Sequence, residues 1–198
     1  MYMQPRDFKT LLIRVHYVIA LEGTNNTLFW FATSAPIDDK QRPFPTRLRS
    51  ALGLSPDINT MFDYKNRIPG IYERLYQFCV ISLCSDMEFF FKDLFSTYGY
   101  KKGRGRGFFQ RFDGVISQLS HDGIDFSSID KDLKNLRLAF MVRHISVHNL
   151  GLVDQDFVAS TKLPVKIGDR FDVDQTLYRK MFDSYVALLK HIDSYCAI

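Results

Sequence analysis

The chain has 198 residues, which suits a single domain and is long enough to bury a hydrophobic core. Its 46% hydrophobic and 24% charged residues are the proportions of an ordinary globular protein, and the absence of any run of about 18 apolar residues argues against a transmembrane helix. The formal net charge of +4 permits an anionic partner without requiring one.

The three cysteines, Cys79, Cys84 and Cys196, form no CxxC pair and leave an odd count. This pattern is typical of reduced thiols that act as small apolar side chains. Cys79 and Cys84 lie in an apolar helical segment, so we expect them to be buried. The first residues contain no cationic stretch followed by an apolar one, so no signal peptide is expected. We therefore expect a cytoplasmic protein.

The first third of the chain begins with a helical pattern. Apolar residues recur at helical spacing over residues 8–21, and the run ends at Gly23. Residues 27–35 are short and apolar, and their pattern does not distinguish a helix from a strand. Residues 36–47 contain three prolines and mixed charges, which predicts a loop.

Two short helices are expected next, over residues 48–54 and 55–64. Ser55 would cap the second helix and Pro56 would occupy its first turn. We assign residues 1–67 to a helical N-terminal extension.

Residues 69–98 form the longest periodic segment, and apolar residues surround nearly its whole circumference. Such a helix is normally central in a bundle or lies at a subunit interface. A glycine-rich break over residues 99–107 follows, and then a modest helix over residues 108–119. Ser127 or Ser128 is expected to cap the next helix.

Residues 153–172 read as irregular, and residues 173–195 as a closing amphipathic helix. The long helical segments, with no convincing alternating strand, predict an all-α protein built as an antiparallel helical bundle. We assign this bundle to residues 68–198.

The helix that ends at Asn149 contains an unusual charge. Arg143 interrupts an apolar stripe formed by residues such as Leu136, Phe140 and Val147. A cation at that position must be paired, extend outward or face a polar cleft.

The segment Arg143–His148 (RHISVH) resembles the R-x4-6-H signature of HEPN domains, and the continuation to Asp154 (HNLGLVD) is similar to the RiboL-PSP-type branch. In that branch an upstream helix often carries an acid in an aromatic-rich run, as at Glu88, and a Gly-Asp turn like Gly168-Asp169 precedes the last helix. The resemblance covers residues 68–198.

The resemblance implies a metal-independent endoribonuclease without a cofactor, in which two protomers pair and line a shared cleft. A ribose 2′-hydroxyl would attack the neighbouring phosphate. His148 would be the acid/base, Arg143 the phosphate clamp and His144 a helper, with Glu88 and Asn149 in support. It further implies a homodimer acting in defence or as a toxin, and it allows for a regulatory partner protein.

The residue types fit this chemistry. Arginine is a permanent cation suited to phosphate, and histidine moves protons near neutral pH. Five residues turn an ideal helix by about 140°, however, so one helix does not automatically unite Arg143 and His148. Alternatively, Arg143 pairs with Glu88 and His148 bonds a backbone carbonyl. The protein would then be a non-catalytic RNA- or nucleotide-binding module, or a scaffold.

His144 and His148 also have the i, i+4 spacing that can hold a metal. No third ligand stands out, because the remaining histidines, His16, His121 and His191, are scattered. We predict no metal site.

Residues 98–112 (YGYKKGRGRGFFQRF) are basic and contain no acid. Their cations are Lys101, Lys102, Arg104, Arg106 and Arg111. Because aromatic residues are interleaved with them and could stack on bases, we predict that this segment contacts RNA. The alternative is a solvated loop whose aromatic side chains turn into the core.

Overall fold

The computed structural model describes residues 4–196, except for the side chains of residues 24 and 25, and no β-strand occurs in that range. The prediction of an all-α bundle is therefore confirmed. The α-helices are α1 (Leu11–Glu22), α2 (Thr24–Gln41), α3 (Thr46–Ala51), α4 (Met61–Lys65), α5 (Glu73–Tyr98), α6 (Phe112–His121), α7 (Asp130–His148), α8 (Gln155–Thr161) and α9 (Gln175–Cys196).

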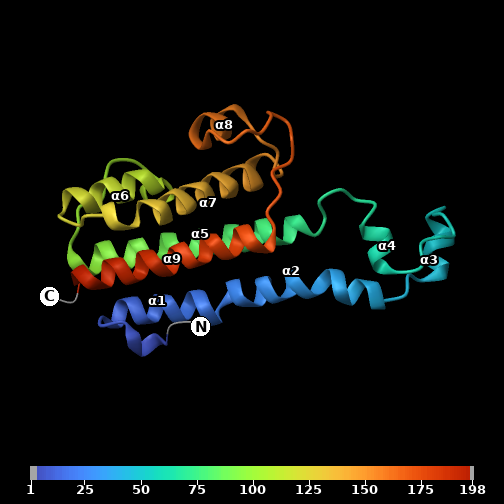
Figure 1. Cartoon of the computed structure of the whole chain (residues 1–198), viewed down its shortest axis with the longest axis horizontal. Coiled ribbons are helices and arrows are strands. Elements are labelled where there is room, and N and C mark those ends of the chain that lie inside the picture. The colour runs from blue at the N-terminus through green and yellow to red at the C-terminus, as the bar shows by residue number, and fades with distance from the viewer. Residues whose placement is uncertain (1–3, 197–198) are drawn as a thin grey trace.

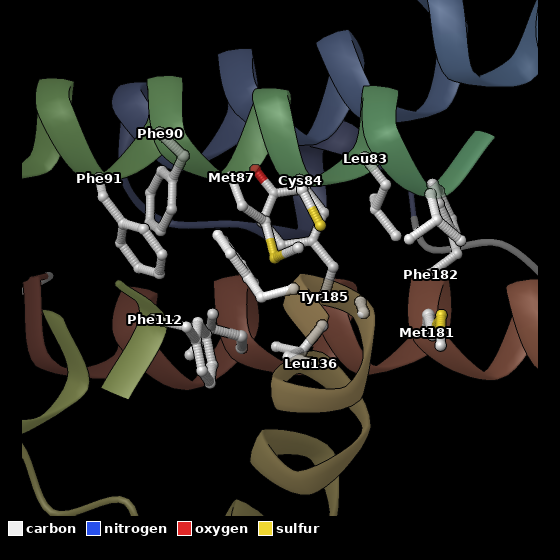
Figure 2. Packing of buried hydrophobic residues seen from close by; sticks show 14 of the residues in the cluster. Leu83, Cys84, Met87, Phe90, Phe91, Phe112, Leu136, Met181, Phe182 and Tyr185 are labelled. Carbon is white, nitrogen blue, oxygen red and sulfur yellow. The ribbon is translucent and has the colours of Figure 1, made fainter. Parts of the chain in front are cut away.

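Helix α5 is the central element of the bundle. It packs against α1 and α2 on one side and against α7 and α9 on the other (Figure 1). Met87 and Phe91 of α5 point toward the opposing helices, where Tyr185 of α9 lies (Figure 2). Burial within one chain therefore accounts for most of its apolar circumference, while Phe78 and Phe89 are each 48% exposed.

The N-terminal helices share this core. Phe8, Tyr17 and Phe29 belong to the same buried cluster as the residues of α5 and α9. Helices α1 and α2 run almost in one line, broken at Gly23, while α3 and α4 lie beyond the far end of α2 (Figure 1). The boundary between residues 67 and 68 stays a prediction.

The prediction of a loop over residues 36–47 was wrong for residues 36–41, which are helical. Helix α2 includes residues 27–35 and continues through Pro36 to Gln41. Proline removes one backbone donor from a helix, and tertiary contacts compensate here. Asp39 is buried and accepts hydrogen bonds from Lys65 Nζ (2.7 Å) and Tyr72 Oη (3.0 Å), which hold the last turn of α2 against α4 and the start of α5.

The predicted cap at Ser55 was also wrong. Helix α4 begins only at Met61, and its cap is Thr60. Thr60 Oγ1 accepts from the Asp63 amide at 3.1 Å, while the Asp63 carboxylate accepts from the Thr60 amide at 2.8 Å. This reciprocal pair satisfies two amides that the first turn of a helix leaves free, which Ser55 and Pro56 cannot do so far upstream.

Neither Ser127 nor Ser128 caps α7. Residues Ser127–Ile129 form a 3₁₀ turn, and α7 begins at Asp130 without a side-chain cap. The Ser127 amide and hydroxyl both bond to the Asp125 carboxylate, at 2.9 Å each. The serine is therefore occupied by a local turn.

Candidate functional site

Helix α7, helix α8 and residues 106–113 surround an open groove of about 580 Å³, which we call the α7–α8 groove. Its charged and titratable lining residues are Arg106, Arg111, Asp113, Arg137, Arg143, His144, His148 and Asp156. The predicted catalytic residues and part of the predicted RNA-binding segment therefore border one surface feature.

Arg143 lies at the inner edge of the groove and pairs with Glu88 of α5. Nη2 of Arg143 is 2.9 Å from Oε1 of Glu88, and the two side chains are 24% and 9% exposed. The contact is an ion pair without hydrogen-bond alignment, and Arg143 Nε is buried without a hydrogen-bond partner within the described chain. Glu88 thus balances the cation while leaving guanidinium donors that its carboxylate does not use.

The neighbourhood of this pair is apolar. Cys84 lies one turn before Glu88 on α5 and is fully buried. Burial raises the pKa of the Cys84 thiol far above its usual range, although the nearby Arg143 cation acts in the opposite direction. The thiol therefore stays neutral, as expected for a structural cysteine.

His144 and His148 lie together on the exposed face of α7. Their ring centroids are 4.9 Å apart, with the ring planes at 51°. Both side chains are exposed, and neither has a hydrogen-bond partner among the described residues. His148 therefore does not bond a backbone carbonyl, in contrast to the alternative considered from the sequence. Both imidazoles remain available to exchange protons with a ligand.

The end of α7 is fixed by a turn that begins at Asn149. The Asn149 side-chain amide donates to the Asp154 carboxylate, which also caps α8 by accepting from the Phe157 amide at 2.8 Å. Gly151 follows with φ +82°, and its amide donates to the Ile145 carbonyl at 2.9 Å. Asn149 thus links the end of α7 to the start of α8 and does not line the groove.

The Gly-Asp turn closes on the same junction. The Val153 amide donates to the Asp169 carbonyl, and the Gly168 amide donates to the Val153 carbonyl, both at 2.8 Å. Gln77 of α5, which is buried, donates through Nε2 to the Phe171 carbonyl at 2.9 Å. These contacts join the end of α7, the turn and α5 into one unit.

The basic segment divides into two groups. Arg106 and Arg111 line the groove, whereas Lys101, Lys102 and Arg104 are exposed outside it. Arg111 Nη2 donates to the Arg104 carbonyl at 2.6 Å, so this cation also holds its own loop.

The aromatic side chains of the segment follow the alternative interpretation. Phe108 is buried, and Phe108, Phe109 and Tyr100 all pack edge-on against Phe95 of α5, with ring centroids 5.3–5.6 Å apart. They anchor the loop to the bundle, and Tyr100 and Phe109 remain partly exposed. Tyr98 remains exposed.

Sequence reasoning missed several lining residues. Helix α8 lies within the segment predicted to be irregular, and it contributes Asp156 and Ser160. Arg137 was also missed, and its Nε bonds Asp113 Oδ1 at 2.7 Å. Spacing could have identified Arg137, because positions 137, 141, 144 and 148 share one helical face. Asp154 could have indicated the start of α8, because aspartate is a preferred residue at the N-cap of a helix.

Other polar clusters lie elsewhere. Among the described residues, no group of three or more His, Cys, Asp or Glu is arranged to hold a metal ion. His16 is buried between α1 and α5 and contacts Asp93 through Nε2 at 3.0 Å. A small apolar cavity of about 30 Å³ beside Phe29 and Phe182 also lies away from the groove and is too small for a nucleotide.

Comparisons with protein-family models, with curated proteins and with solved structures found no match. No helix in the described part of the chain is long and apolar enough to cross a membrane.

Proposed function

We propose that this protein is a metal-independent endoribonuclease whose active site is the α7–α8 groove. The observation that carries the proposal is the convergence of Arg143, His144 and His148 with the cations Arg106 and Arg137 along one groove. Four arginines line the groove beside the carboxylates Asp113 and Asp156, and arginine favours a phosphate-bearing ligand. Two exposed imidazoles within contact of each other add groups that can take up and release protons.

The proposed reaction needs only these groups and the RNA itself. One imidazole takes the proton of a ribose 2′-hydroxyl, whose oxygen forms a bond to the adjacent phosphorus. The bond from phosphorus to the 5′-oxygen breaks, and His148 gives that oxygen a proton. The products are a 2′,3′-cyclic phosphate and a 5′-hydroxyl. Arg143 would stabilise the charge that develops on the phosphorane oxygens.

A homodimer is part of the proposal. Val147 and Leu150 flank His148 and are 52% and 63% exposed, so apolar surface borders the proton carrier. A second copy that covers this surface would shield the site from water. Arg143–His148 resembles the HEPN signature, and proteins of HEPN families often act in defence or as toxins. We extend the proposal to such a role and to a regulatory partner protein.

One observation favours a second candidate, a non-catalytic RNA-binding or protein-interaction module. Arg143 forms an ion pair with Glu88 and is only 24% exposed, which also suits a structural role. In that case the groove would bind RNA through Arg106 and Arg137 and would cleave nothing.

The test is cleavage of a mixed RNA pool in EDTA by wild type, His148→Ala, His144→Ala and the control His121→Ala. His121 is an exposed histidine of α6 that does not line the groove. We expect wild type and the control to cleave equally. His148→Ala should lose about 10²- to 10⁴-fold in rate, which is typical when a proton carrier is removed. Product ends should be cyclic phosphate and 5′-hydroxyl.

Cleavage that requires a divalent cation, or an equal loss in the His121→Ala control, would contradict the proposal. RNA binding without any cleavage by the wild type would select the second candidate.

A further inference from the structure

The α7–α8 groove continues along α7 toward the start of that helix. A second groove of about 450 Å³, which we call the distal groove, shares Arg137 and Ser160 with the first. Its other lining residues come from the same two helices and the residues after α8. They are Lys134, Asn135, Leu138, Thr161, Lys162 and Leu163. The two grooves therefore form one track.

The distal groove is lined by cations and by no carboxylate. Lys134 forms an ion pair with Asp130 at 2.6 Å, but both side chains are more than 60% exposed. Such an exposed pair is weak and easily exchanged for a phosphate. Arg137 is held by Asp113 at the junction between the two grooves. The distal groove is therefore positive, whereas Asp113 and Asp156 line the α7–α8 groove together with its arginines, and the histidines lie in that groove.

Lys162 occupies an unusual backbone position at the rim. It follows the last residue of α8 with φ +54°, a left-handed conformation that glycine and asparagine adopt more easily than lysine. Backbone preference therefore does not account for a lysine there. Lys162 and Lys134 both line the distal groove.

We propose that Lys134, Arg137 and Lys162 form a subsite for the backbone of single-stranded RNA beside the scissile phosphate. The inference deepens the proposed function and depends on it for the position of the reacting phosphate. From residue 134 to residue 148 an α-helix rises about 21 Å, which is longer than one nucleotide. The substrate is accordingly an extended strand of several nucleotides, and a dinucleotide leaves the distal groove empty.

The test measures binding of RNA that cannot be cut, so it does not depend on catalysis. The ligands are a fully 2′-O-methylated dinucleotide and a single strand of about ten nucleotides, labelled for fluorescence anisotropy. The variant is Lys134→Gln/Lys162→Asn, since asparagine tolerates the left-handed backbone. The matched control is Lys131→Gln/Lys180→Gln, which removes two exposed lysines outside the track.

We expect the variant to lose about tenfold in affinity for the long strand and the slope of log K against log salt to fall by about 1.4, because two phosphate contacts disappear. Dinucleotide binding and the control variant should match wild type. Equal losses in the variant and the control, or equal losses for both ligands, would overturn the subsite.

Failure of this inference can be told apart from failure of the proposed function. Length-dependent binding by a protein that cleaves nothing keeps the subsite and removes the nuclease. Cleavage whose KM is the same for long and short substrates keeps the nuclease and removes the subsite.

Discussion

The ion pair between Arg143 and Glu88 allows the structural and chemical roles of Arg143 to be separated. The change Arg143→Met keeps much of the apolar stem of the side chain but leaves the Glu88 carboxylate, only 9% exposed, without its cation. Breaking a buried pair costs about 3–5 kcal/mol, and the 24% exposure of Arg143 places this case near about 3 kcal/mol. For a chain of this size the melting temperature should fall by about 6–12 °C.

The double variant Arg143→Met/Glu88→Leu supplies the comparison. Replacing both members of a buried pair by apolar residues is often neutral, so we expect urea unfolding to return to within about 1 kcal/mol of wild type. The reasoning would be refuted by a double variant as unstable as Arg143→Met. It would equally be refuted by a single variant within about 0.5 kcal/mol of wild type, which would show that the pair contributes nothing.

The same variants report on chemistry. If the guanidinium acts on the phosphate, the double variant is stable and cleaves RNA about 10²- to 10³-fold more slowly than wild type. A stable double variant that retains full activity would restrict Arg143 to a structural role. Measuring stability and cleavage on one protein sample therefore distinguishes a chemical role of Arg143 from a purely structural one.

Two further predictions concern stability. Burial raises the pKa of Asp86 to about 6, so the stability that its neutral form confers is complete below its unfolded pKa of 3.8 and is lost as the pH rises through about 6. After allowance for solvent screening, Asp86→Asn should therefore raise the free energy of unfolding by about 1 kcal/mol at pH 7.5. Near pH 3.5 the same change should have no effect. An equal gain in the free energy of unfolding at both pH values would refute this prediction. In Gly151→Ala the new methyl carbon would lie 2.5 Å from Gln77 Nε2, so urea unfolding should show a loss of about 3 kcal/mol. The control Gly168→Ala, with φ +87° and open space, should lose only about 1 kcal/mol, and similar losses in both would contradict the packing argument.

The sequence predicted the long helices well because their periodicity is strong and their tertiary environment agrees with it. The helices α5 and α9 occupy nearly the ranges expected from their apolar spacing. It failed where distant contacts decide the outcome. Residues after Pro36 remain helical because Asp39 is bonded to Lys65 and Tyr72, and neither partner is close in sequence. Helix α8 is too short to show a clear helical periodicity, and its residues stand among irregular neighbours. The cap at Asp154 alone was therefore not enough to predict it.

The candidate site was predictable in its residues more than in its shape. Arg143, His144 and His148 were identified from one short motif, and the groove brings all three together. The sequence could not show which cations of the basic segment line the groove. Arg106 and Arg111 do, whereas Lys101, Lys102 and Arg104 do not. This division follows from the packing of Phe108 and Phe109 on Phe95, which directs one end of the loop to the groove.

The rotation around α7 between Arg143 and His148 explains why the two side chains lie on different sides of the helix. About 140° of helical rotation turns Arg143 inward toward Glu88, while His148 stays on the exposed face at the end of α7. His144 lies between them, about 40° around the helix from His148, and its ring contacts His148 at 4.9 Å. Around the helix, His144 is therefore nearer than His148 to Arg143. For the proposed reaction within one protomer, we therefore assign His144 to accept the 2′-hydroxyl proton, which leaves His148 to protonate the leaving oxygen.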